Sequence, residues 1–179
     1  MLYLFLADGF EETEALAPLD MMRRAKIEVK TVGVTGEFVT GSHGVTVKAD
    51  LKPEEISFNN IDGVVLPGGM PGTVNLGKSE TVTKAAVYCA ENGKITAAIC
   101  AAPSVLGNLG ILKGKKATCF PGFEKELEGA TYTAAPVEID GNVITGKGAG
   151  CAILFGKAIV EKAVSAEAAN KVCGDMQCP

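Results

Sequence analysis

The stretch TAAICAAPS, residues 96–104, ends an apolar run with a cysteine and continues with small residues and a proline. A short apolar run bounded by turn residues is typical of a buried strand. Pro103 suits the first turn of a helix, so the stretch predicts a strand, a sharp turn at Cys100 and then a helix. A strand that passes directly into a helix is the connection expected in an α/β fold.

Similar runs, rich in β-branched residues, recur along the chain between stretches with helical spacing. Strands that alternate with helices indicate a mostly parallel sheet with helices on both faces. We therefore expect an α/β sandwich of three layers. The six runs are LYLFLA (2–7), VKTVGV (29–34), GVTVKA (44–49), DGVVLP (62–67), KITAAIC (94–100) and NVITG (142–146).

Three segments between the runs predict helices: residues 12–26, 79–94 and 150–165. In the second segment, Ser79 is a suitable N-terminal cap and Gly93 a suitable stop. Apolar residues at helical spacing predict the sides that face the sheet. They are Leu16, Leu19, Met22 and Ala25 in the first segment, Val82, Ala86 and Cys89 or Ala90 in the second, and Ile153, Leu154 or Phe155, Ala158 and Ile159 in the third.

Shorter elements are expected elsewhere. Residues 38–50, FVTGSHGVTVKAD, predict a turn-rich hairpin attached to the sheet, because glycines flank short alternating runs. Short helices are expected after Pro103 and after Ala166. The terminal CGDMQC pairs Cys173 with Cys178; we expect a frayed tail without a role there, with metal binding or oxidation as the alternative.

Length and composition fit one globular domain over residues 1–179, because 47% of the residues are hydrophobic. The formal net charge of −4 comes from 21 acidic and 17 basic side chains without a block of like charge, which argues against a specific nucleic-acid partner. No segment supplies the roughly 20 unbroken apolar residues that a membrane-spanning helix needs. We expect a soluble protein with no membrane partner.

The six cysteines, at positions 89, 100, 119, 151, 173 and 178, lack the clustered spacing of a disulfide-stabilised mini-domain or a structural zinc site. The apolar start of the chain lacks the basic region of a secretory signal. These features predict a cytoplasmic location with reduced thiols, and no metal.

Three runs end in residues that are unusual for plain connections: ADGFEETE (7–14), LPGGMPG (66–72) and ICAAPS (99–104). Open α/β sheets place functional sites at the carboxyl ends of their strands. If these ends converge, a cysteine at a turn, a glycine-rich loop and an acidic cluster meet in space. Each feature has an ordinary alternative when taken singly: an inert buried cysteine, a plain turn and a solvated helix start.

The amides of a helix start are expected to lower the pKa of Cys100. Lowering a thiol pKa from about 8.5 to about 6 needs roughly 3.4 kcal/mol, whereas a helix terminus gives at best about 2. A carboxyl group from Glu11, Glu12 or Glu14 is expected to help by keeping its proton and donating a hydrogen bond to the sulfur. Two like charges about 4 Å apart repel by about 4 kcal/mol, so sulfur and acid should share one proton. The expected result is a sulfur ionised near neutral pH.

Taken together, FEETEA (10–15), VVLPGG (64–69) and AAICAAPS (97–104) resemble the signature segments of the ThiJ/PfpI superfamily, in the DJ-one-like branch around a parkinsonism-associated protein. The resemblance covers nearly the whole chain. It implies a flavodoxin-like three-layer α/β/α sandwich with a mostly parallel sheet, similar to class I glutamine amidotransferases. It also implies a homodimer.

The resemblance further implies residue roles. Cys100 falls on the family's nucleophile and Glu14 on its acidic partner. The backbone amides of Gly69 and Ala101 fall on the donors that would receive charge on a carbonyl oxygen. Cys119 is expected to pack in the interior, with a role as a resolving thiol for Cys100 as the alternative.

Departures from the family pattern narrow the chemistry. Phe120 stands where many relatives have a histidine near the nucleophile, and Ala101 stands where the protease branch has one, so a peptidase is disfavoured. His43 falls where the branch often has an arginine that reaches a neighbouring subunit's site, and Arg24 resembles a residue at the dimer contact; the alternatives are an exposed loop histidine and a helix-surface cation. The candidates for the pocket or the dimer interface are His43, Arg24, Gly68 and Phe120.

The function that the resemblance implies is a cysteine-dependent enzyme of the glyoxalase or deglycase type, with neither metal nor organic cofactor. Its partners would be small reactive aldehydes or glycated adducts. The alternative is a redox-sensing chaperone that responds through oxidation of Cys100. A purely structural or nucleotide-binding module, with an unreactive Cys100, is the third hypothesis.

Overall fold

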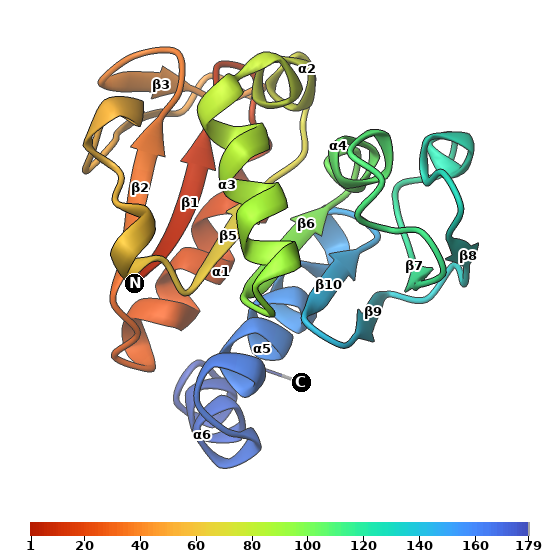
Figure 1. The fold of residues 1–179 in the computed structure, drawn as a ribbon. Coiled ribbons are helices and arrows are strands. Elements are labelled where there is room, and N and C mark those ends of the chain that lie inside the picture. Colours follow the sequence, from red (N-terminus) through yellow and green to blue (C-terminus); the bar gives the residue numbers. More distant parts are fainter. Residues whose placement is uncertain (179) are drawn as a thin grey trace.

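The computed structural model describes residues 1–178 and contains a central six-stranded sheet (Figure 1). The strand order is β2-β1-β5-β6-β10-β9, and every pair is parallel except β10 with β9. The five parallel strands, counted along the chain, follow the flavodoxin-like order 2-1-3-4-5, which confirms the predicted fold. The strands are β1 (Leu2–Leu6), β2 (Val29–Gly33), β5 (Gly63–Leu66), β6 (Ile95–Ile99), β9 (Val137–Asp140) and β10 (Val143–Gly146).

Helices cover both faces of the sheet and enclose two apolar clusters (Figure 1). One face carries α1 (Glu12–Arg24), α5 (Ala152–Ala163) and α6 (Ala166–Asp175), and the other carries α2 (Gly72–Lys78), α3 (Glu80–Glu91) and α4 (Pro103–Asn108). Every residue of strand β1 is buried, because successive side chains point to opposite faces and helices cover both faces. Its leucines belong to the cluster under α1 and α5, whereas Tyr3 and Phe5 belong to the cluster under α3.

All the predicted helices are present, and Ser79 caps α3 by accepting a hydrogen bond from the Val82 amide. The buried side of α1 is wider than its spacing predicts, because this helix packs against α5 as well as the sheet. Met21 is fully buried there, whereas Leu16 is only partly buried. In α5 the core position belongs to Phe155, and Leu154 is exposed.

The predicted hairpin is formed by β3 (Phe38–Thr40) and β4 (Thr46–Lys48), which pair as a separate antiparallel sheet. The run at residues 44–49 therefore belongs to the hairpin and not to the parallel sheet. Two elements of the sandwich itself were not predicted, namely the edge strand β9 and helix α2. The remaining unpredicted elements are short: β7 (Lys116–Ala117), β8 (Thr131–Tyr132) and the 3-10 helices η1 (Pro53–Glu55), η2 (Phe58–Asn60), η3 (Glu124–Glu126) and η4 (Ala149–Cys151).

The expectation of a frayed tail is wrong as far as residue 178, since α6 runs to Asp175 and the residues after it close a regular helix cap. Residue 179 lies outside the described part of the chain. Within residues 1–178, none of the helices has the length and apolar character that crossing a bilayer would require.

Candidate active site

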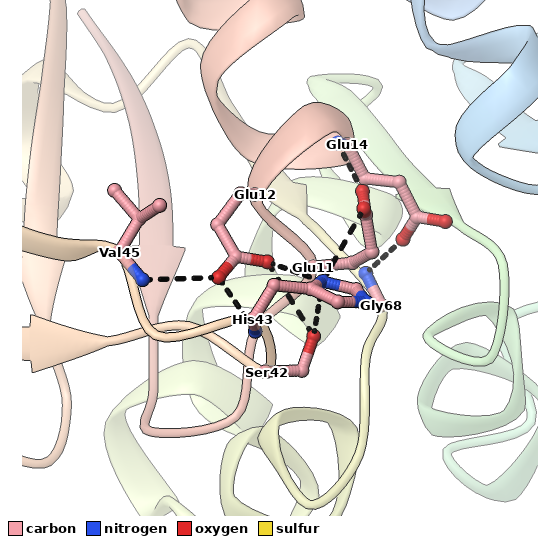
Figure 2. A network of polar contacts seen from close by, with 7 residues as sticks. All are labelled: Glu11, Glu12, Glu14, Ser42, His43, Val45 and Gly68. Atoms are coloured by element: carbon pink, nitrogen blue, oxygen red, sulfur yellow. Dashed lines mark hydrogen bonds and ion pairs between the residues drawn. The ribbon is translucent and has the colours of Figure 1, made fainter.

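The segments that follow β1, β5 and β6 meet at one edge of the sheet, because these strands are neighbours. The Glu11 amide donates to the Gly68 carbonyl at 3.0 Å, and the Gly68 amide donates to Glu14 Oε2 at 2.9 Å (Figure 2). Gly68 in turn lies against Cys100, since a Cβ placed on Gly68 would be 2.6 Å from Cys100 Cβ. The predicted convergence of the three strand ends is confirmed.

Cys100 forms the corner between β6 and α4 with a φ of +66°. This left-handed conformation costs a residue with a side chain about 1–2 kcal/mol, and such strain is concentrated at functional sites. Neighbouring backbone holds the corner in place: the Cys100 amide donates to the Gly146 carbonyl at 2.8 Å, and the Phe120 amide donates to the Cys100 carbonyl at 2.8 Å. The predicted turn at Cys100 is therefore present and is held from two sides.

Two backbone amides also act on the Cys100 sulfur. The N–H groups of Ala101 and Gly69 both lower its pKa. Gly69 has a φ of +87°, a backbone conformation that residues with a side chain rarely adopt. This conformation sets the direction of its amide. These are the two amides that the resemblance implied as oxyanion donors.

Glu14 is fully buried beside this thiol. Its Oε2 accepts the Gly68 amide, and its Oε1 has no hydrogen-bond partner among the described residues. The Cys100 thiol is the neighbouring titratable group that interacts with this carboxyl group. The arrangement leaves one carboxyl oxygen free to exchange a proton with the sulfur.

The protonation of this pair differs from the sequence-based expectation. Burial, followed by the charge of Glu14 and its hydrogen bond, raises the pKa of Cys100 to about 12. The two amides oppose this effect and do not overcome it. Burial also raises the pKa of Glu14 to about 7, and the charge of Glu11 acts in the same direction. The interactions with Cys100 and Gly68 lower this pKa but do not overcome the effect of burial. At neutral pH the shared proton therefore lies on the sulfur, and the acid is poised to receive it.

The other two acidic residues of the cluster have structural partners. Glu11 is the N-terminal cap of α1, and its Oε2 accepts the Glu14 amide at 2.7 Å. Glu12 Oε1 accepts the amides of His43 at 2.7 Å and Val45 at 3.4 Å (Figure 2). Glu12 thus holds the β3–β4 turn against the start of α1, a role that the sequence did not reveal.

His43 completes this contact from the solvent side. Its side chain is 71% exposed, and its Nδ1 lies 2.9 Å from Glu12 Oε2. The hydrogen bond and charge of Glu12 raise the pKa of His43. Although burial raises the pKa of Glu12, the hydrogen bonds from His43 and from the backbone lower it to about 2. His43 is therefore an exposed loop residue in the single chain, and its expected place at the pocket or the dimer interface stays a prediction.

One group of residues in the described chain has metal-ligand character: Glu11, Glu12 and His43 lie within 4.8 Å of one another. Their carboxylate oxygens already accept hydrogen bonds from the start of α1 and from the β3–β4 turn. We therefore interpret the group as a polar clasp, termed the Glu12–His43 clasp below.

The remaining predicted residues lie at different distances from the sulfur. Phe120 is next to Cys100 through its backbone, and its ring is half-exposed. Arg24 lies at the other end of α1 from Glu14, about 15 Å along the helix axis, and pairs with Asp20 at 2.7 Å. Cys119 is fully buried, and burial followed by the charge of Glu124 raises its pKa to about 11.

A cavity of about 410 Å³ lies on the α2, α3 and α4 side of this edge. Met70 follows Gly69 in the glycine-rich loop, and Ser104 follows Cys100 by one helical turn, so the cavity adjoins the site without including the sulfur. Its remaining lining residues are Thr73, Val74, Gly77, Thr83, Val105, Asn108, Leu109, Gly122, Phe123 and Glu126.

Comparison with known proteins agrees with this geometry. The DJ-1/PfpI family matches residues 1–162. Protein DJ-1 homolog B from Arabidopsis thaliana is 35% identical over 174 residues, which is 96% of this chain and 40% of that protein. The chain spans 44% of a second Arabidopsis relative, so it covers less than half of both. A protein from Thermococcus kodakarensis named a deglycase is 36% identical over 144 residues, 79% of this chain and 86% of that one.

The fold comparison extends over almost every residue. The crystal structure of Drosophila melanogaster DJ-1beta has a TM-score of 0.93 and 33% sequence identity, and covers 99% of this chain and 97% of that chain. The residues matched by the family include the strand ends that carry Cys100 and Glu14. The chain belongs to the DJ-1/PfpI family.

Proposed function

We propose that the protein is a cysteine-dependent enzyme that acts on reactive aldehydes, of the glyoxalase or deglycase type. The observation that carries the proposal is the pairing of Cys100 with Glu14. A thiol on a strained corner, facing two backbone amides, lies beside a buried acid with a pKa of about 7. General bases work best when their pKa lies near the working pH.

In the first step the thiol adds to the aldehyde carbon of methylglyoxal or an adduct. Because Cys100 holds its proton at neutral pH, attack is coupled to proton transfer from Sγ to Glu14. The bond from sulfur to carbon forms, and the electron pair of the carbonyl group moves to its oxygen. The Gly69 and Ala101 amides stabilise the charge that develops there, and Glu14 returns the proton to give a hemithioacetal.

Glu14 also serves the second step for methylglyoxal. It removes the proton from the carbon that carries sulfur and delivers a proton to the neighbouring carbon, which converts the hemithioacetal into a thioester. Water then hydrolyses the thioester, restores the Cys100 thiol and releases lactate. The overall change adds one water to methylglyoxal and needs no external oxidant or reductant.

The relatives support an aldehyde-directed activity. Three archaeal proteins named deglycases are 33–36% identical to the chain. The cavity beside the site offers space for the body of a glycated substrate whose carbonyl group reaches Cys100. We therefore extend the proposal to glycated adducts as well as free aldehydes.

A redox-sensing chaperone that works through Cys100 is less well supported. Peroxides oxidise the thiolate and not the thiol, and the raised pKa of Cys100 keeps the thiolate fraction low at neutral pH. The proposal therefore assigns Cys100 to carbonyl chemistry.

The test is lactate formation from methylglyoxal by the purified, reduced protein. We expect turnover in the native protein, background rates in Cys100→Ser, and a loss of about 10²–10⁴-fold in Glu14→Gln. Cys178→Ser, which removes a thiol at the chain end, is the matched control and should behave as the native protein. Equal turnover in the native and Cys100→Ser proteins would exclude the mechanism.

A further inference from the structure

The last helix ends in a motif that brings two cysteines together. Helix α6 runs to Asp175, Met176 is its C-terminal cap, and Gln177 follows with a φ of +57°. The Gln177 amide donates to the Gly174 carbonyl at 3.1 Å, and the Cys178 amide donates to the Cys173 carbonyl at 3.0 Å. This pair of hydrogen bonds, with a left-handed residue between them, is a Schellman cap.

In a Schellman cap, the two residues joined by the outer hydrogen bond normally bring apolar side chains into contact. Here both positions are cysteines, Cys173 and Cys178. The 3.0 Å backbone hydrogen bond brings the two residues together, and the Cys178 thiol is close enough to affect the titration of Cys173. The cap therefore places two cysteines at neighbouring positions that usually carry an apolar pair.

The two thiols are also accessible. Cys173 packs on the edge of the core cluster under α5, and both cysteines are partly exposed. Neither thiol belongs to the active site, and neither takes part in the reaction assigned to Cys100. Their chemistry can therefore change without altering the Cys100–Glu14 pair.

We propose that Cys173 and Cys178 form a peroxide-responsive dithiol that closes reversibly into an intrachain disulfide across the end of α6. A disulfide requires Cα atoms about 4.4–6.8 Å apart. The 3.0 Å backbone hydrogen bond from the Cys178 amide to the Cys173 carbonyl holds the two residues close enough to approach this condition. The bridge closes a six-residue loop around a cap that already has the bridged shape.

The reaction balances with hydrogen peroxide or an organic hydroperoxide as the oxidant. The outer sulfur, Cys178, attacks the O–O bond and becomes a sulfenic acid, releasing water or an alcohol. Cys173 then attacks that sulfur, loses its proton, and displaces hydroxide, which leaves as water. The two thiols lose two hydrogen atoms and two electrons, and the peroxide is reduced.

The order of attack follows from the surroundings of the inner sulfur. Burial, and then the adjacent Cys178 thiol, raises the pKa of Cys173. Cys173 also packs against the core cluster under α5, so the outer Cys178 meets peroxide first and Cys173 serves as the resolving thiol. Once formed, the disulfide ties the last turn of α6, which packs on α5, to the residues that follow it.

Peptide mass spectrometry tests the proposal directly. The folded, full-length protein is treated with mild hydrogen peroxide, alkylated with iodoacetamide and cleaved after Lys171, so that both cysteines fall in the fragment of residues 172–179. We expect this fragment to be two hydrogen atoms lighter and unalkylated, and to regain two alkylation sites after dithiothreitol. Oxidation of Met176 adds an oxygen atom and is distinguished by its mass. Double alkylation after peroxide, an oxygen adduct on a single cysteine, or bridges only between chains would overturn the proposal.

Variants of Gln177 test whether the cap drives the reaction. Glycine adopts a positive φ freely, whereas a β-branched residue does so rarely. The Cys173–Cys178 disulfide should form in Gln177→Gly at least as fast as in the native protein. In Gln177→Ile it should form about tenfold more slowly, which corresponds to about 1.4 kcal/mol of added strain. Equal rates in the two variants would mean that the cap does not bring the thiols together. Because lactate formation is assayed separately, failure of this proposal and failure of the proposed enzyme function are distinguishable.

Discussion

The Gly68 amide donates a 2.9 Å hydrogen bond to Glu14 Oε2, and residue 68 has no room for a side chain. A Cβ there would lie 2.6 Å from Cys100 Cβ and 2.7 Å from Glu14 Oε2. The glycine therefore sets how closely the acid and the thiol approach. Its small size is what allows one proton to be exchanged between them.

Replacing this glycine should separate the pair. We expect Gly68→Ala to lose at least about tenfold in turnover and to be destabilised by about 1–3 kcal/mol, since an overpacked site must shift its neighbours. Turnover and urea unfolding measure the two effects. The control is Gly174→Ala in α6, where a Cβ meets open space; it should keep native turnover. Native turnover in Gly68→Ala would show that the spacing is not limiting.

Glu14→Gln should make Cys100 easier to alkylate and the enzyme slower. The charge and hydrogen bond of Glu14 raise the pKa of Cys100, so their removal shifts the pH midpoint of iodoacetamide labelling downward. Turnover nevertheless falls, because no group accepts the thiol proton during attack. A labelling profile that moves upward would show that Glu14 stabilises the thiolate instead.

The same acid should give opposite pH effects on rate and stability. The kcat/KM should rise as pH increases through about 7, where Glu14 becomes the base. The folded-state pKa of Glu14 is raised above its unfolded value, so its contribution to stability is complete below about pH 4.5 and is lost as pH rises through about 7. Between pH 4.5 and pH 8, the free energy of unfolding of Glu14→Gln should therefore rise by about 3 kcal/mol relative to that of the native protein. Urea unfolding at several pH values measures this, and a difference that does not change with pH would contradict the assignment.

The Glu12–His43 clasp predicts a local effect. Glu12→Ala leaves the amides of His43 and Val45 without their carboxylate, which costs about 1–3 kcal/mol where those groups stay shielded from water. Hydrogen exchange should therefore speed up in residues 41–46. The pKa of His43, followed by NMR, should fall because its partner charge is gone. The control Glu37→Ala, at an exposed position, should change neither the hydrogen exchange of residues 41–46 nor the pKa of His43. Unchanged exchange in the turn would show that the carboxylate does not hold it.

The sequence predicted the central sheet, its helices and the meeting of the three strand ends, because apolar periodicity and turn residues are local signals. It did not separate the roles of Glu11, Glu12 and Glu14. Those roles depend on the side of α1 that each residue occupies and on a hairpin about 30 residues away, as with His43. The direction of the Cys100 pKa was also missed, because burial depends on side chains from several elements, and its effect exceeded that of the two amides.

The cavity beside the site should matter for glycated adducts and not for free aldehydes. Val74 lines it from α2 and is 40% exposed, so Val74→Trp can fill part of the cavity without entering the core. If the body of an adduct lies there, KM for a glycated peptide should rise about tenfold, which corresponds to a loss of about 1.4 kcal/mol in binding. KM for methylglyoxal should not change, since that molecule needs only the region around Cys100.

The control for adding a tryptophan to the surface is Val164→Trp, because Val164 is 53% exposed and lies beyond the end of α5. This variant should leave KM unchanged for both substrates. An equal rise in KM for both substrates in Val74→Trp would mean that the cavity is part of the route to Cys100 for every substrate. No rise in KM with either substrate would place the body of the adduct on another side of the thiol, for example beside the half-exposed ring of Phe120, whose amide donates to the Cys100 carbonyl.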